Sequence, residues 1–316
     1  MDNLTHSLVG AVIGQLGLKK KTGLAMPTLI IAANLPDIDA ACAVYGIESL
    51  SMRRGITHGP IALILLPLLL WALMIGFDHW QERRGKRPAS RLPLDKGWLL
   101  ALAYIGCLSH PALDWLNNYG VRLLEPFSHR WFYGDTLFII DLWIWLALGL
   151  SVWLSLRRER KGAPNWQRPA WSGFALVSAY IFANGLITGA AERTATAALL
   201  ASGHPNPLVV ASPPPLAFWT RDVFWRADGR YGSGSFTPGI GGNLDIDGKP
   251  TGMDELRLAR AKSDPAVQAF LFWARMPVAR SEHGEIVLRD QRYMQPLARD
   301  RFTVRMKAPD TASRAE

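Results

Sequence analysis

Residues 108–120 read LSHPALDWLNNYG and end an apolar run that begins at Gly97. His110 and Asp114 stand four residues apart in this stretch, so a helix places both side chains on one face. Ionisable groups in an apolar run are costly unless they are paired, bound to a metal or in contact with water, and they indicate a functional site. The other polar residues that lie at the depth of this pair should therefore belong to the same site.

The composition is that of a membrane protein. Of the 316 residues 49% are hydrophobic and 13 are tryptophan, and the mean hydropathy of +0.07 is too high for an ordinary soluble enzyme. The net charge of +9 does not indicate a nucleic-acid partner, because the basic residues cluster in short segments between apolar runs. Cys42 and Cys107 lack metal-ligand spacing, so neither a disulfide framework nor a thiolate zinc site is expected.

Apolar runs predict an all-α integral membrane domain over residues 1–190, with about five to six apolar helices. The runs cover residues 4–18, 24–35, 57–77, 97–116, 136–156 and 170–190. The first run is shorter than the roughly 20 residues of a full span, so it is expected to enter only part of the bilayer. A Pro-rich stretch then begins at Pro205, and residues 191–316 are expected to form a soluble α+β domain. Its predicted strands lie at 208–211, 216–226, 285–289 and 302–306, and its predicted helices at 254–261 and 265–275.

Charge predicts the orientation in the membrane. Residues 19–21, 78–96 and 157–168 hold fourteen Lys and Arg residues, and alternating spans place all three segments on one side. The positive-inside rule makes that side cytoplasmic. We therefore expect a multi-pass protein of the bacterial inner membrane with an extracytoplasmic C-terminal domain.

The same topology gathers polar residues at the outer ends of the helices. They are His6, Asp37, Asp39, His58, His110, Asp114, Asp135 and Asp141. Imidazole nitrogens and carboxylate oxygens suit zinc best, with manganese or iron as less favoured occupants. Taken singly, His110 could be a buried hydrogen-bonded histidine, and Asp37 with Asp39 could cap a turn after Pro36. Taken together, they predict a metal site for one to three ions.

Two arginines precede His58 on the expected outer side. Arg53 and Arg54 would suit an anionic substrate group, because guanidinium binds phosphate and carboxylate bidentately. The alternatives are contact with a lipid headgroup or an ion pair with an aspartate such as Asp37. Asp39 is the candidate catalytic base or a further metal ligand.

Five motifs carry a resemblance to a known family: THS at 5–7, LPDID at 35–39, RRGITHG at 53–59, the His110–Asp114 pair leading into NYG at 118–120, and GDTLFIID at 134–141. Over residues 1–190 the chain resembles the membrane-bound metal-dependent hydrolases of the YbcI/YdjM group. That group is distantly similar to the all-helical zinc phospholipase C and zinc-dependent nuclease class, whose sites hold three zinc ions. The resemblance implies that His6, Asp37, His58, His110 and Asp114 are metal ligands, with Asp39 as ligand or base. The chain departs from the soluble class in lacking its N-terminal tryptophan ligand and a second HxxxD/E pair.

These observations predict a metal-dependent hydrolase that cleaves a phosphoester of a lipid or lipid-linked substrate at the outer face of the membrane, by metal-activated water. Asp39, Arg53 and Arg54 are its candidate catalytic residues. The alternative is a non-enzymatic, metal-stabilised membrane scaffold or regulator whose C-terminal domain binds a partner protein. A closed site with four protein ligands per ion would favour the scaffold, and an open position beside the arginines would favour hydrolysis. Transport is disfavoured, because no inverted repeat is seen and the polar cluster lies at one face.

Overall fold

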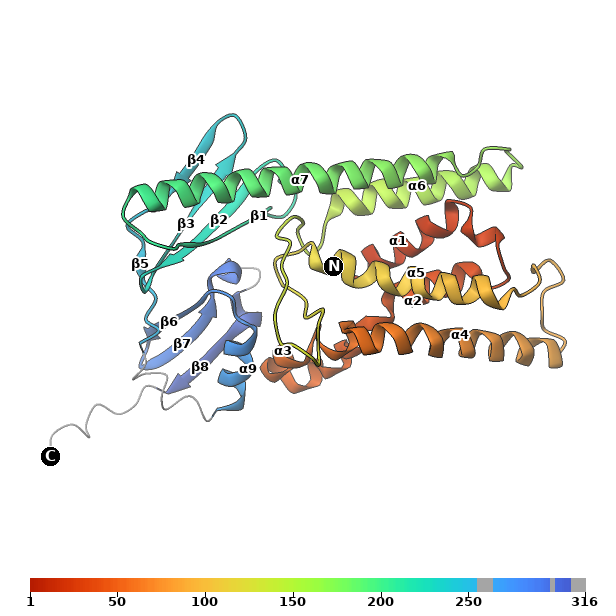
Figure 1. Cartoon of the computed structure of the whole chain (residues 1–316), viewed down its shortest axis with the longest axis horizontal. Coiled ribbons are helices and arrows are strands. Elements are labelled where there is room, and N and C mark those ends of the chain that lie inside the picture. Colours follow the sequence, from red (N-terminus) through yellow and green to blue (C-terminus); the bar gives the residue numbers. More distant parts are fainter. Residues whose placement is uncertain (255–263, 296–298, 308–316) are drawn as a thin grey trace. The chain divides into compact units, whose positions relative to one another are not determined.

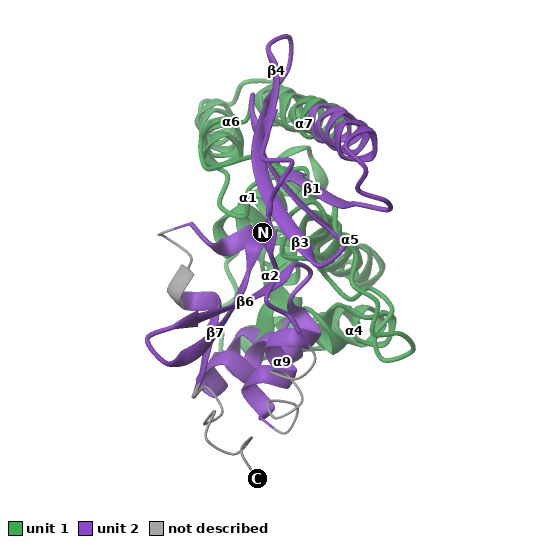
Figure 2. Ribbon diagram, turned by 90° about the vertical axis from the view of Figure 1, so that its left-hand side faces the viewer, with its two compact units in different colours: residues 1–39, 54–186, 212–218 green, residues 40–53, 187–211, 219–316 purple. Residues whose placement is uncertain are grey.

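The computed structural model describes residues 1–254, 264–295 and 299–307 (Figure 1). The chain divides into two units, which Figure 2 distinguishes by colour. Unit 1 comprises residues 1–39, 54–186 and 212–218, and unit 2 comprises residues 40–53, 187–211 and 219–316. Each unit is described by itself.

Unit 1 is helical. Its helices are α1 (Asn3–Gln15), η1 (Leu18–Lys20), α2 (Ala25–Asn34), η3 (Ile56–His58), α4 (Pro60–Arg83), α5 (Lys96–Trp115), α6 (Leu142–Arg160) and the first part of α7 (Arg168–Ala201). η2 (Leu35–Glu48) follows α2 directly and continues into unit 2. Asp2, Asp95 and Asp141 accept hydrogen bonds from first-turn backbone N–H groups of α1, α5 and α6. Such N-caps fix where each of these helices begins.

α2 lies between α1 and α5, and glycines allow the close approach on both sides. A Cβ atom on Gly10 of α1 would lie 2.8 Å from the carbonyl oxygen of Leu29, and one on Gly106 of α5 would lie equally close to the same atom. α4 packs on α5, and α6 packs on α1. The segments that carry the polar residues of the N-terminal region are thereby held against one another.

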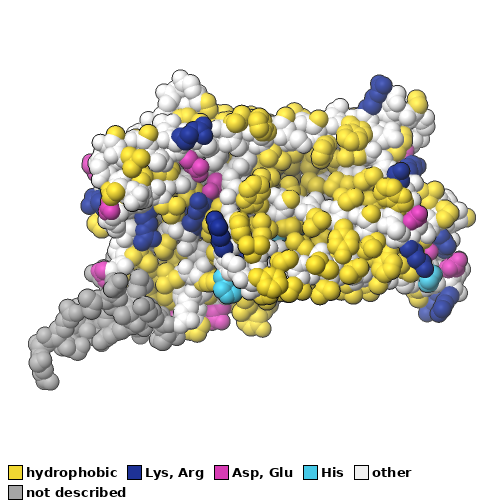
Figure 3. Space-filling model, in the orientation of Figure 1, with side chains coloured by type: hydrophobic (Ala, Val, Ile, Leu, Met, Phe, Trp, Pro, Cys, Tyr) yellow, Lys and Arg dark blue, Asp and Glu magenta, His cyan; other side chains and the backbone are white. Residues whose placement is uncertain are grey.

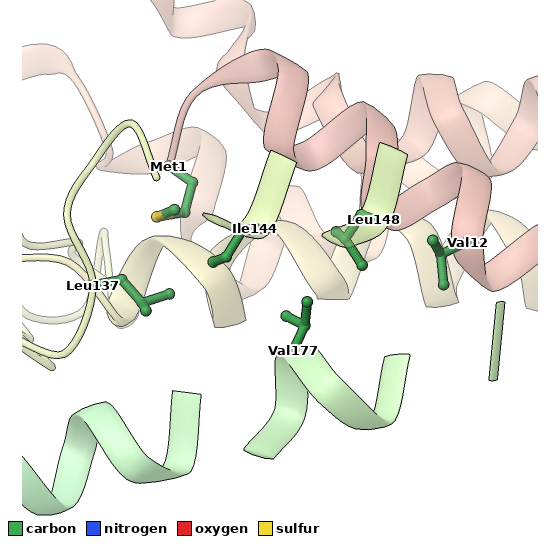
Figure 4. Packing of buried hydrophobic residues seen from close by; sticks show 6 residues of the cluster. All are labelled: Met1, Val12, Leu137, Ile144, Leu148 and Val177. Atoms are coloured by element: carbon green, nitrogen blue, oxygen red, sulfur yellow. The ribbon is translucent and has the colours of Figure 1, made fainter. Parts of the chain in front are cut away.

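A buried hydrophobic cluster joins α1, α6 and α7. The buried cluster shown in Figure 4 consists of Met1, Val12, Leu137, Ile144, Leu148 and Val177. Because Met1 belongs to this cluster, the start of α1 is anchored to the beginning of α6.

The three basic segments meet at one end of unit 1. Lys19 forms an ion pair with Glu159 of α6, the Gly23 N–H donates to the carbonyl of Pro93 at 3.0 Å, and the Lys21 ammonium lies 4.8 Å from the Trp98 ring centroid. The first turn of α1, the last turns of α5 and the first turn of α6 lie at the opposite end (Figure 1).

Three helical segments are long and apolar enough to cross a membrane: Ala25–Met52, Pro60–Arg83 and Arg168–Ala201. On α4, Ile64, Leu65, Leu69 and Leu73 are each more than half exposed, and Figure 3 shows many hydrophobic side chains on this face of the molecule. The expectation of five to six membrane helices is met only in part, since the other described helices do not combine this length and hydropathy. α5 carries His110 and Asp114, and α6 ends in Arg157, Arg158 and Arg160, which lowers their hydropathy.

Unit 2 contains two sheets. The first has the order β1 (Leu208–Ser212), β2 (Arg221–Ala227), β3 (Arg230–Thr237) and β4 (Gly241–Leu244), with β5 (Lys249–Pro250) also paired to β3. The second is the antiparallel sheet β6 (Pro277–Glu282), β7 (Glu285–Asp290) and β8 (Thr303–Lys307). The remaining helices are α3 (Ser49–Met52), α9 (Pro265–Trp273), η5 (Gln291–Tyr293) and η6 (Arg299–Phe302). Trp225, Phe270 and Trp273 are fully buried in this part of the chain.

A helical region followed by a sheet-containing region confirms the expected order of fold classes. β1, β7 and β8 lie close to predicted strands, and α9 lies within a predicted helix. The strand predicted from Leu216 begins only at Arg221, and β3 was not predicted because its sequence RYGSGSFT is rich in Gly and Ser. The helix predicted over residues 254–261 lies outside the described residues. The assignment of 1–190 to the membrane and 191–316 to the extracytoplasmic side stays a prediction.

Candidate metal centre

Two histidine rings direct one nitrogen each toward a common point. His110 Nδ1 lies 2.7 Å from the carbonyl oxygen of Ala33, which can only accept, so the Nδ1–H donates there, and in the neutral ring Nε2 carries the lone pair. His58 Nδ1 lies 2.9 Å from Thr57 Oγ1, whose hydroxyl donates to Asp39 at 2.8 Å, so His58 Nε2 also carries a lone pair. These tautomers follow from the hydrogen-bond network. The two Nε2 atoms are 3.2 Å apart, a separation that calls for a proton or a metal cation between them.

Two carboxylates complete the group. Asp114 Oδ2 lies 3.3 Å from His58 Nε2 and 3.5 Å from His110 Nε2, and Asp37 Oδ1 lies 3.6 Å from His110 Nε2. One ligand atom from each of the four residues lies within 4.8 Å of the other three. Ligands about 2.0–2.2 Å from a tetrahedral zinc ion stand roughly 3.3–3.6 Å apart. These four separations, between 3.2 and 3.6 Å, lie in or next to this range, and Asp37 lies within 4.8 Å of the other two ligand atoms. The imidazole and carboxylate donors are of the kind that binds zinc.

His6 extends the group on the other side of Asp114. Its ring stacks on His110 with centroids 3.8 Å apart, and its Nε2 lies 3.4 Å from Asp114 Oδ1. Apart from this approach, neither ring nitrogen of His6 forms a hydrogen bond with the described residues, although the side chain is fully buried. A buried polar atom without a partner costs about 1–3 kcal/mol, which a cation near His6 would offset. Asp114 thus faces His6 with Oδ1 and the other two histidines with Oδ2.

Arg54 is held inside the same site. Its Nε lies 3.1 Å from Asp114 Oδ2, its Nη1 donates to Asn117 Oδ1 at 3.0 Å, and its guanidinium lies 4.7 Å from the Tyr119 ring centroid. The residue is 4% exposed. Buried guanidinium in this position lowers the cost of burying the Asp114 carboxylate.

The buried charges are nevertheless unequal. Three carboxylates, those of Asp37, Asp39 and Asp114, face the Arg54 guanidinium and the Met1 amino group, which is paired with Asp114. With all the histidines neutral, one negative charge is left uncompensated away from water, which is costly, and either a proton on a histidine or a bound metal cation would balance it.

Asp39 lies one layer behind the ligand atoms. Its Oδ2 accepts hydrogen bonds from the backbone N–H of Arg54 at 2.7 Å and from Thr57 Oγ1, and it lies 3.5 Å from His58 Nδ1. A carboxylate behind the Nδ1 of a ligating histidine fixes the ring and raises its basicity. Asp39 is therefore placed to position His58.

A family model described as YdjM inner membrane protein matches residues 1–191. The chain belongs to the YdjM inner membrane protein family. No curated protein and no solved structure matches the chain. The family match confirms the predicted resemblance to the YdjM group. It also confirms the prediction that the chain is an inner membrane protein. Hydrolase activity and likeness to zinc phospholipase C stay predictions.

All the candidate site residues of this YdjM-family chain except Arg53 lie in unit 1. The structure gathers seven of them: His6, Asp37, Asp39, Arg54, His58, His110 and Asp114. It does not bring Asp135 and Asp141 into that group. Asp141 accepts backbone N–H groups at the start of α6 and the Tyr180 hydroxyl at 2.9 Å, so it caps a helix. Asp135 is buried in a left-handed backbone conformation, and Arg53, half-buried, belongs to unit 2.

Several partners were missed from the sequence. Thr57, Asn117, the Ala33 carbonyl and the Met1 amino group all contact site residues. Asn117 lies about one helical turn after Asp114, and Thr57 immediately precedes His58, so their positions were the available signal. A backbone carbonyl leaves no trace in the sequence.

Proposed function

We propose that this protein is a membrane-bound metal-dependent hydrolase that cleaves a phosphoester of a lipid or lipid-linked substrate at the outer face of the inner membrane. The observation that carries the proposal is the convergence of Asp37, His58, His110 and Asp114, whose ligand atoms lie within 4.8 Å of one another. Zinc is the proposed metal, in one to three ions, because the donors are imidazole and carboxylate at tetrahedral spacing.

A divalent ion bound there would supply a water of lowered pKa and polarise the phosphoryl oxygen. Side chains of the protein would accept the proton and bind the anionic substrate group. Asp39 holds the His58 ring, and its Oδ1, which has no hydrogen-bond partner among the described residues, is the atom left to accept a proton. Arg54 uses Nε and Nη1 within the site, which leaves Nη2 for an anionic substrate group.

The arrangement of unit 1 supports the location. The basic segments meet at one end and the four ligand residues lie toward the other, and Lys and Arg mark the cytoplasmic side of membrane proteins. Exposed apolar side chains on α4 would face lipid tails. A site at the outer interface would meet phosphoesters of membrane lipids.

A second function, a metal-stabilised scaffold or regulator, has one observation in its favour. His58, His110 and Asp114 are 0% exposed and Asp37 is 8% exposed, and four protein ligands would fill a tetrahedral ion. In this alternative the C-terminal domain would bind a partner protein, and the metal would hold α5 to the segments before α4.

Turnover and metal content separate the two functions. The full chain, purified in detergent and supplied with zinc, is assayed on phospholipid in mixed micelles and on a chromogenic phosphodiester. Hydrolysis is expected from the parent and from His79→Ala, an exposed histidine near the basic end of α4, and a loss of about 100-fold or more is expected in His110→Ala and Asp114→Ala. If the parent binds zinc but shows no turnover, the scaffold function is favoured over the hydrolase. If His110→Ala and Asp114→Ala keep their full zinc content, both proposed functions are refuted.

A further inference from the structure

Unit 2 contains a cavity of about 390 Å³ with a charged wall. β2, β3, β5, β6 and the segment from Gln291 onward contribute to it. Its charged and amide lining residues are Asp222, Asp245, Lys249, Arg280, Gln291 and Gln295. Cavities that bind small molecules measure about 300–1,000 Å³. Its volume therefore suits a small ligand, and its charges indicate which kind.

One side of the wall carries a carboxylate without a cation. Asp222 Oδ2 accepts a hydrogen bond from Gln295 Nε2 at 2.8 Å, and no Lys or Arg of the described chain forms an ion pair with it. Burial raises the pKa of Asp222, since desolvation outweighs the hydrogen bond from Gln295. An ammonium group of a ligand would give this carboxylate the counter-charge that it lacks.

Another part of the wall carries two cationic side chains that form no ion pair with a carboxylate of the described residues. Arg280 Nη2 donates to the Tyr231 hydroxyl, and its guanidinium lies 5.8 Å from the Tyr231 ring centroid. Within residues 1–254, 264–295 and 299–307, neither Arg280 nor Lys249 pairs with an acidic side chain. Asp245 also lines the cavity, but its Oδ1 accepts the Gly248 N–H at 3.1 Å, and it forms no ion pair with a Lys or Arg among the described residues. The acids and the bases of this cavity therefore do not neutralise one another.

The β2–β3 register separates Asp222 from Tyr231, the residue that pairs with Lys249 in the sheet and accepts a hydrogen bond from Arg280. Asp222 pairs with Ser235, whereas Tyr231 pairs with Arg226, four residues further along β2. At about 3.3 Å per residue, the backbone positions of Asp222 and of the residue opposite Tyr231 are about 13 Å apart along the strand. A ligand that meets both ends must carry its own charges well apart.

Gln291 adds a hydrogen-bond acceptor between Asp222 and Tyr231. Its Nε2 donates to the carbonyl of Gly232, opposite Trp225 in the same register, and this bond fixes which amide atom is the oxygen. Oε1 then has no hydrogen-bond partner among the described residues, and Gln291 is only 4% exposed. A buried acceptor of this kind requires an N–H or O–H donor.

We propose that this cavity binds a short zwitterionic peptide of two or three residues. The ammonium group pairs with Asp222, a backbone N–H donates to Gln291 Oε1, and the carboxylate pairs with Arg280 and Lys249. An extended chain of three residues spans about 10 Å, which a single amino acid cannot do.

Calorimetric titration of the full chain in detergent tests the proposal, with trialanine, its N-acetyl form and its C-terminal amide as probes. Trialanine is expected to bind, and each blocked form is expected to bind at least about tenfold more weakly. In Asp222→Asn the penalty for N-acetylation should disappear, and in Arg280→Gln the penalty for amidation should disappear. Asp228→Asn, in an exposed turn, and Arg305→Gln, on β8, are the matched controls and should bind as the parent does.

Three results would overturn the proposal: no binding of trialanine up to about 10 mM, equal affinity for the blocked forms, or unchanged discrimination in both cavity variants. Glycine or phosphoethanolamine binding as tightly as trialanine would also overturn it, in favour of a smaller zwitterion. Circular dichroism of each variant shows whether it is folded. If one cavity variant does not fold, the other decides with its own blocked probe, and Lys249→Gln, at an exposed position, replaces Arg280→Gln with the amidated probe.

Discussion

The substitution Asp39→Asn should weaken zinc binding without removing any of the four grouped ligand atoms. Asp39 lies 3.5 Å from His58 Nδ1 and accepts from Thr57 and from the Arg54 backbone, which an asparagine oxygen can also do. The fold around it should therefore persist, while the negative charge behind the imidazole is lost. Loss of such a partner lowers metal affinity by about 10- to 100-fold, or about 1.4–2.7 kcal/mol.

The assay is competition between the protein in detergent and a chromogenic zinc chelator, with the zinc-dependent rise in melting temperature as a second measurement. Asp37→Asn, which alters one of the four grouped ligands, should lose more affinity than Asp39→Asn, and the exposed Asp228→Asn should lose none. An affinity within about threefold of the parent, or a loss equal to that of Asp37→Asn, would refute the positioning role.

Three further predictions concern the framework. Gly106→Val should destabilise the helices by about 1–3 kcal/mol, measured by thermal unfolding, because any Cβ would lie 2.8 Å from the Leu29 carbonyl oxygen; a neutral effect would contradict the tight α2–α5 contact. Asp141→Ala should cost about 0.5–2 kcal/mol through its lost cap and leave zinc content unchanged, whereas lost zinc would make Asp141 a ligand. Burial acts to raise the pKa of Asp290, but the Arg292 guanidinium and backbone N–H groups hold it below its usual value. The stability that Asp290 contributes should thus be present above about pH 4 and lost as pH falls through its lower folded pKa, and Asp290→Asn should remove that slope in circular dichroism melts.

Spacing and chain order revealed much of the site. His110 and Asp114 share a helical face at four-residue spacing, and they do lie together, each next to His58. Asp37 was expected at the same depth because it ends an apolar run. These features depend on helix periodicity and on the alternation of spans, which a sequence displays.

The remaining features depend on contacts that sequence patterns do not specify. Asp141 begins an apolar helix just as a ligand at a span end would, and only the structure shows that its oxygens cap α6 and meet Tyr180. Arg54 was expected either to bind an anionic group or to pair with an aspartate such as Asp37, and the structure pairs it with Asp114, across 60 residues of chain. The number of membrane-spanning helices was overestimated, because α5 and α6 gain their helical length partly from polar residues.

The metal content of the purified chain tests the central claim most directly. After reconstitution with zinc and removal of excess ion, elemental analysis should find about one zinc ion or more per chain in the parent and in His79→Ala, and about a tenth of that or less in His110→Ala. A parent chain that retains no divalent metal, or a His110→Ala variant that retains as much as the parent, would contradict a metal centre built on Asp37, His58, His110 and Asp114.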